Sequence, residues 1–148
     1  MKSKPTVVID TNLFISAIIK GGTPFELLKQ WQNNEFLLVT TQRIFEEIAE
    51  VFRRDVIFHK YQLNQAEIQQ LLSSLRLNAK FVTPLNIKEL PVHSRDLKDD
   101  KILAAALSGE VNFLISGDED LLSLNDDPNL GNLKILTARE FLKRLVQN

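Results

Sequence analysis

The sequence predicts an α/β domain with a central, mostly parallel β-sheet flanked by helices. Runs of β-branched and apolar residues typical of strands alternate along the chain with segments of helical spacing. The 148 residues, 44% of them hydrophobic, suffice for one core and are few for two, so we expect a single domain over residues 1–148. Acidic residues follow two of the predicted strands, at the sheet edge where parallel α/β folds bind ligands.

The first half of the chain predicts two strands and three helices. Residues 6–9 are typical of a strand buried on both faces, and helical spacing follows over residues 13–19. Thr23-Pro24-Phe25-Glu26 predicts a helix start with Thr23 as its cap and Pro24 in the first turn, and this helix should reach about residue 33. Residues 36–39 predict a second strand, and Thr41 is placed to cap a helix reaching about residue 54.

The second half predicts three more strands and three longer helical segments. Asn64-Gln65-Ala66-Glu67 is a capping box that opens a helix, and Thr137-Ala138-Arg139-Glu140 opens the last helix in the same way. A helix is also expected over residues 97–107. The remaining expectations are a weak strand at 81–82, a loop at 84–95, strands at 113–115 and 134–136, a helical turn at 119–124 and a polar loop at 125–129.

Composition excludes several classes of site. The absence of cysteine rules out disulfides, zinc–thiolate centres and thiol nucleophiles, and it fits a cytoplasmic protein. The apolar run after the first residues is too short for a signal peptide, and no segment approaches the length of a membrane span. The net charge of -1 gives no overall basic surface for nucleic acid.

Four acidic positions stand where the predicted fold would bring them together: Asp10, Glu47, the pair Asp99 and Asp100, and Asp118. Asp10 and Asp118 follow predicted strands, whose carboxyl ends meet at one sheet edge. Glu47 lies three residues after Ile44, beside the apolar stripe of its helix, whereas Glu46 lies on the polar face.

The adjacent aspartates open the helix expected at residues 97–107. Asp100 precedes Leu103 and Ala104 by three and four positions, which turns it toward the packed side, and the placement of Asp99 is less clear. Each acid taken singly also has an ordinary explanation: a helix cap, a favourable charge at a helix N-terminus, or a surface side chain whose stem packs. Convergence of all four is harder to explain in this way.

Convergent carboxylates indicate a metal site, because two like charges about 4 Å apart repel by roughly 4 kcal/mol at an effective dielectric near 20. Mg²⁺ and Mn²⁺ prefer oxygen ligands and would neutralise such a cluster.

With these residues identified, nearly the whole chain resembles the PIN-domain family of metal-dependent ribonucleases. The resemblance begins at Val8-Ile9-Asp10-Thr11-Asn12 and continues through Phe45-Glu46-Glu47-Ile48. It extends to Asp99-Asp100 with the following alanine-rich segment, and to Ser116-Gly117-Asp118-Glu119-Asp120, in which Ser116 replaces the family's common threonine. Each motif is weak alone, and four in order are strong.

The resemblance implies a PIN-like three-layer fold and Mg²⁺ or Mn²⁺ bound by Asp10, Glu47, Asp100 and Asp118, which would be the catalytic set. Asn12, Ser116, Asp99 and Asp120 would support these ligands. The segment at residues 134–142 is similar to small bacterial PIN proteins related to the VapC toxins. This implies a toxin of a toxin–antitoxin pair, with an antitoxin partner and a homodimer.

The expected reaction is hydrolysis of RNA phosphodiesters, with the carboxylates as metal ligands and one of them able to relay a proton. Basic candidates for contacts with RNA phosphates are Lys20, Arg43, Arg53, Arg54 and Lys101. The main alternative is a catalytically inactive PIN-like module that binds RNA or protein. A haloacid dehalogenase-like phosphatase is disfavoured because Asn12 stands where a second aspartate is needed, and a receiver domain because no suitable lysine follows a late strand.

Overall fold

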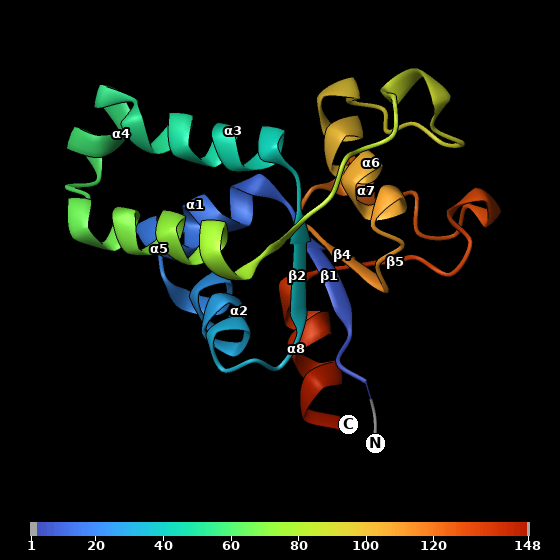
Figure 1. The fold of residues 1–148 in the computed structure, drawn as a ribbon, viewed down its shortest axis with the longest axis horizontal. Helices are drawn as coiled ribbons and strands as arrows, with labels where there is room; N and C mark the ends of the chain where they lie inside the picture. Colours follow the sequence, from blue (N-terminus) through green and yellow to red (C-terminus); the bar gives the residue numbers. More distant parts are fainter. Residues whose placement is uncertain (1–2, 148) are drawn as a thin grey trace.

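A computed structural model of the protein describes residues 3–147. Its five strands form one sheet in the order β3-β2-β1-β4-β5, and every neighbouring pair is parallel. The prediction of an α/β fold with a largely parallel sheet is therefore confirmed (Figure 1). The strands are β1 (Thr6–Ile9), β2 (Leu37–Thr40), β3 (Lys80–Phe81), β4 (Phe113–Ile115) and β5 (Lys134–Leu136).

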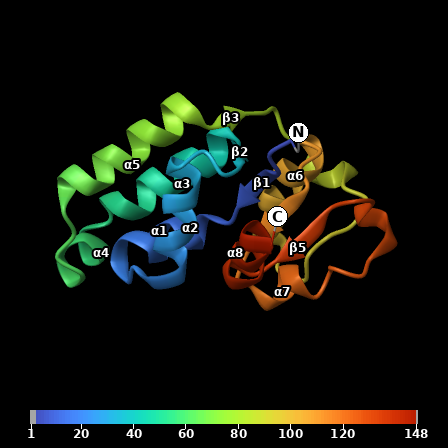
Figure 2. The same cartoon turned by 90° about the horizontal axis from the view of Figure 1, so that it is seen from below.

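The helices form two layers around this sheet. They are α1 (Thr11–Ile19), α2 (Gly22–Gln32), α3 (Gln42–Arg53), α4 (Asp55–Lys60), α5 (Gln65–Asn78), α6 (Asp100–Ser108), α7 (Glu119–Leu122) and α8 (Ala138–Gln147). Three short 3-10 helices, η1 (Ile87–Glu89), η2 (Leu97–Asp99) and η3 (Pro128–Leu130), lie in the connections. Figures 1 and 2 place α1 to α5 on one side of the sheet and α6 and α7 on the other, and α8 packs against β5 and α2.

This arrangement creates a switch point between β1 and β4. The chain leaves β1 toward the helix layer that contains α1, and it leaves β4 toward the opposite layer that contains α7 (Figure 1). In open parallel sheets the crevice at such a point, at the carboxyl ends of the strands, is where ligands bind. The register aligns Ile9 with Ile115, so both strands end at the same level.

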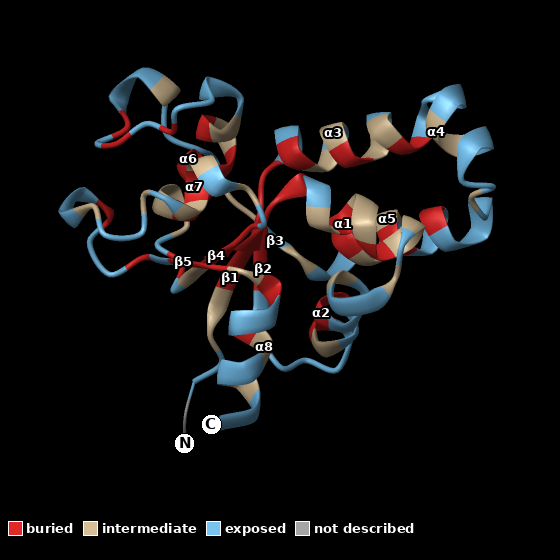
Figure 3. Cartoon of the chain, turned by 180° about the vertical axis from the view of Figure 1, so that it is seen from behind, coloured by how far each residue is buried: buried red, intermediate tan, exposed pale blue. Residues whose placement is uncertain are grey.

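The core lies along the central strands and the helices that cover them. Val7, Val8, Leu114 and Ile115 are all fully buried, as the buried colouring of β1 and β4 in Figure 3 shows. On the other side of the sheet the buried alanine run at 104–106 lets α6 pack closely. Burial of the strands on both faces matches their nearly uninterrupted apolar sequence.

Several helix starts follow the predicted caps. Thr41 accepts a hydrogen bond from the Ile44 N–H, and Asn64 accepts from the N–H groups of Ala66 and Glu67. At the start of α8, the Thr137 side chain accepts from the Glu140 N–H while the Glu140 carboxylate accepts from the Thr137 N–H. These are the local bonds that satisfy the free N–H groups of a helix N-terminus.

Other local predictions were wrong. The predicted cap Thr23 lies inside α2, which begins at Gly22 after Gly21, because both glycines adopt the positive φ angles that the chain needs there. The short helix α4 was not predicted. The helix expected over residues 97–107 is divided into η2 and α6, and this division changes the direction of the side chains in its first turn.

Among residues 3–147, none of the helices combines the length and the apolar character that crossing a bilayer requires.

Candidate metal centre

Asp10 lies directly after β1 and is only 4% exposed. Its N–H donates to the Ile115 carbonyl at 2.9 Å, so the backbone continues the β1–β4 pairing for one more residue. Its carboxylate caps α1 by accepting from the Asn12 N–H at 3.4 Å. Asp10 therefore does cap helix α1, and this role uses one oxygen of its buried carboxylate.

Ser116 joins the ends of the two central strands. This fully buried residue follows β4, and its hydroxyl donates to Asp10 Oδ2 at 2.8 Å. Ser116 Oγ in turn accepts a hydrogen bond from the Asp118 N–H at 3.0 Å. One hydroxyl thus fixes the position of the Asp10 carboxylate and of the backbone that carries Asp118, whose own carboxylate caps α7 through the Asp120 N–H at 2.8 Å.

Asp99 completes a group of three aspartates from separate parts of the chain. It ends η2, and its carboxyl group lies within hydrogen-bonding range of that of Asp118. Burial, the negative charges of Asp118 and Asp10, and this hydrogen-bonding contact raise the pKa of Asp99 to about 7. Its Oδ2 is buried and has no hydrogen-bond partner among the described residues.

Glu47 reaches the same region from α3. Its helix buries Ile44 and Ile48, and Glu47 is half-buried beside them, whereas Glu46 is exposed and bonded to Gln42. The Glu47 carboxylate forms an ion pair with Lys101 from the first turn of α6. We refer to Asp10, Glu47, Asp99 and Asp118 as the acidic cluster.

Asp10 is influenced by the charges of two other members of the acidic cluster, Asp118 and Glu47. Burial raises the pKa of Asp10 above its ordinary value, and the hydrogen bonds from Ser116 and Asn12 lower it in part. The charges of Asp118 and Glu47 raise the pKa of Asp10 further. The metal-free cluster therefore carries charges that the protein's own hydrogen bonds do not fully compensate.

Asp100, expected to be a metal ligand, faces away from the acidic cluster. It is fully buried, accepts from the Ser94 N–H at 2.8 Å and lies 2.7 Å from His93 Nδ1. Adjacent residues on a helix point about 100° apart, so only one of the two aspartates can face the sheet edge. In the structure Asp99, and not Asp100, lies beside Asp118.

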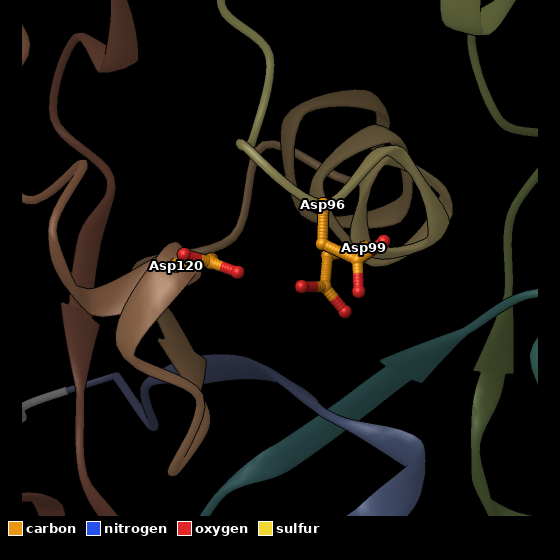
Figure 4. Close-up of side chains that lie close together, drawn as sticks. All are labelled: Asp96, Asp99 and Asp120. Carbon is orange, nitrogen blue, oxygen red and sulfur yellow. The ribbon is translucent and has the colours of Figure 1, made fainter.

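Two further aspartates lie at the outer side of the acidic cluster. Carboxylate oxygens of Asp96, Asp99 and Asp120 lie within 4.8 Å of one another, and Figure 4 shows Asp120 projecting from α7 toward the two others. Asp120 also forms an ion pair with Arg95 at 3.2 Å. Sequence reasoning missed Asp96, although its spacing of three residues before Asp99 is that of neighbours on a helical turn.

The remaining predicted residue, Asn12, contacts Asp10 through its backbone N–H, and it is exposed. The structure therefore records no side-chain contact by which Asn12 would orient Asp10.

The residues present fit a divalent cation. The acidic cluster supplies carboxylate oxygens from four separate segments, and Asp99 Oδ2 is buried without a hydrogen-bond donor among residues 3–147. A buried acceptor left in this state costs free energy that coordination to a hard cation would recover. A cavity of about 840 Å³ lies elsewhere, between α3, α4 and α5, and none of the four cluster residues lines it.

Two comparisons with known proteins bear on this site. Residues 6–120 match the family model described as the PIN domain, and this range contains all four residues of the acidic cluster. The uncharacterized protein MJ1680 of Methanocaldococcus jannaschii is 30% identical over 148 aligned positions, which cover 96% of this chain and 92% of that protein.

The raised pKa of Asp99 predicts that the metal-free protein loses stability as the pH rises. An unfolded aspartate has a pKa of about 3.9, so between that value and about 7 the folded protein binds more protons, and its free energy of unfolding falls with increasing pH. Asp99→Asn should therefore be more stable than the wild type at about pH 8 by about 1–2 kcal/mol, less than the full shift implies because the cluster is partly solvated.

Urea unfolding in chelator at about pH 5 and about pH 8 measures this effect. Asp126→Asn, an exposed loop variant, should keep the wild-type pH dependence. Equal pH dependence in the wild type and Asp99→Asn would contradict the assignment of the raised pKa to Asp99.

The different surroundings of the adjacent aspartates predict opposite effects on stability. Asp100→Ala should lower the free energy of unfolding by about 1–3 kcal/mol, because the buried Ser94 N–H loses its acceptor. Asp99→Ala removes a repelled carboxylate and should not destabilise the metal-free protein. Urea unfolding of both variants tests this, and a larger loss for Asp99→Ala would show that the two roles are reversed.

Proposed function

The chain belongs to the PIN-domain family, and on that premise we propose that it is a ribonuclease that uses Mg²⁺ or Mn²⁺ to hydrolyse RNA phosphodiester bonds. PIN domains are generally metal-dependent nucleases, and carboxylate oxygens of Asp96, Asp99 and Asp120, at the outer side of the acidic cluster, lie close enough together to hold a metal ion. The observation that carries the proposal is the buried, unpartnered Asp99 Oδ2 beside Asp118 and Asp10.

The proposed ligands are Asp10, Glu47, Asp99 and Asp118, with Asp99 taking the place first given to Asp100. When bound, Mg²⁺ or Mn²⁺ would lower the pKa of a water molecule and stabilise charge on the attacking and leaving oxygens. Ser116 holds Asp10 Oδ2 and the backbone of Asp118 in fixed positions before any cation arrives. Such prepositioning by supporting hydrogen bonds raises the affinity of a metal site.

A toxin role, an antitoxin partner, a homodimer and a cytoplasmic location form the finer part of the proposal. The toxin role, the antitoxin and the homodimer are supported by the resemblance of residues 134–142 to small bacterial PIN proteins related to VapC toxins, and the location by the absence of cysteine. A neighbouring reading frame that encodes a small DNA-binding protein would support the pairing, and light scattering of the purified protein would test the dimer.

Neutral variants of the acidic cluster should lose RNA cleavage while a matched neighbour does not. Glu47→Gln and Asp10→Asn should each lower Mn²⁺-dependent cleavage about 100-fold or more, because each removes a charged ligand. Glu46→Gln makes the same chemical change one residue away, on the exposed face of α3, and should retain activity. Cleavage of a labelled single-stranded RNA, with and without chelator, measures this. Loss of activity in Glu46→Gln alone would refute the proposed ligand set.

Mn²⁺ should stabilise the protein against heat. At a concentration of about 100 times the dissociation constant, one bound ion adds about 2.7 kcal/mol to the free energy of unfolding, which raises the melting temperature by about 5–10 °C. Asp10→Asn should lose most of this shift, and Asp126→Asn should keep it. A wild-type protein that binds RNA but shows no shift with Mn²⁺ would instead support the alternative, a catalytically inactive RNA-binding module.

A further inference from the structure

Lys101 is built into the edge of the acidic cluster. Its Nζ lies 2.5 Å from Glu47 Oε2, and the two side chains are only 19% and 32% exposed. Lys101 comes from the first turn of α6 and Glu47 from α3, so the pair joins helices from the two layers of the fold. The Arg54–Glu50 and Arg95–Asp120 pairs are more exposed. The Lys101–Glu47 pair is thus better shielded than either of these pairs, and it involves a proposed metal ligand.

The ammonium group and a divalent cation would compete for the same carboxylate. Lys101 Nζ lies against Glu47 Oε2, so a cation bound by the Glu47 carboxylate would lie near the ammonium group. The ammonium group and a divalent cation next to the same carboxylate would repel each other, because the site is partly shielded from solvent. A lysine has donors but no acceptor atoms, and its flexible stem lets the ammonium move while its backbone stays in place.

We propose that Lys101 exchanges one anion for another. Without a divalent cation it pairs with Glu47, and once a cation has taken that carboxylate, the ammonium binds a non-bridging phosphate oxygen of the RNA backbone at the cluster. This inference rests on the proposed nuclease function and identifies a residue that binds the phosphodiester. The Lys101 ammonium group would then be released from Glu47, and available to the anionic substrate, only when the metal needed for cleavage is bound.

The first test is the affinity for Mn²⁺ alone, measured by calorimetry. Lys101→Met removes the competing ammonium and should bind Mn²⁺ about tenfold more tightly than the wild type. Lys101→Arg keeps a competing cation and should stay close to the wild type. Lys98→Met removes the same charge from an exposed position in η2 and should also stay close to the wild type, which controls for net charge. Lys101→Gln serves as a second neutral variant if Lys101→Met loses its thermal unfolding transition.

The second test is cleavage of a single-stranded RNA at saturating Mn²⁺. Lys101→Met should raise KM about tenfold and reduce the salt dependence of RNA binding by about one phosphate contact. The effect on kcat should be smaller, and Lys101→Arg should restore much of the affinity. Lys98→Met should leave KM unchanged.

The outcomes separate this inference from the proposed function. If the wild type takes up Mn²⁺ and cleaves RNA, but Lys101→Met binds Mn²⁺ as tightly as the wild type or more weakly, Lys101 only positions Glu47 and the inference is overturned. If the wild type neither takes up Mn²⁺ nor cleaves RNA, the proposed function fails and the inference fails with it. Tighter Mn²⁺ binding together with a raised KM supports both.

Discussion

The parallel pairing of β1 with β4 is the constraint on which the acidic cluster depends. Because Ile9 and Ile115 are paired, the residues that follow them, Asp10 and Ser116, emerge side by side from segments 106 positions apart in the sequence. The Ser116 hydroxyl then bonds to the Asp10 carboxylate and to the N–H of Asp118. The site is thus fixed by the buried sheet, and a change of register would separate the carboxylates.

The fold and three of the four cluster positions followed from local sequence signals. Thr41 and Asn64 cap helices where their spacing to the next apolar residues predicts, and uninterrupted apolar runs identified the buried strands. The apolar stripe of α3 was sufficient to place Glu47 beside the buried face of the helix and Glu46 on the polar face. Asp10 and Asp118 follow closely after β1 and β4. Their location at the carboxyl end of the sheet could therefore be predicted from the strands alone.

Features that depend on exact helix boundaries could not be read in this way. The division of residues 97–107 into a 3-10 turn and an α-helix rotates the first-turn side chains, and sequence spacing does not indicate where this change occurs. For this reason sequence spacing did not indicate that Asp99, and not Asp100, would lie beside Asp118. The start of α2 was misplaced because a good capping sequence at Thr23 competed with the glycines before it, whose positive φ angles the fold requires.

The adjacent aspartates show how the fold separates stability from chemistry. Asp100 is fully buried but bonded to the Ser94 N–H and to His93, so its burial ties the preceding loop to α6. This anchor holds η2 in the orientation that presents Asp99 to Asp118. Asp99, by contrast, has a buried Oδ2 with no hydrogen-bond partner in the described part of the chain, and its pKa is raised. The Asp100 carboxylate has its hydrogen bonds formed within the protein and so supports the structure. The Asp99 carboxylate keeps an oxygen available for a ligand, and the anchoring by Asp100 provides the rigidity that such a ligand site needs.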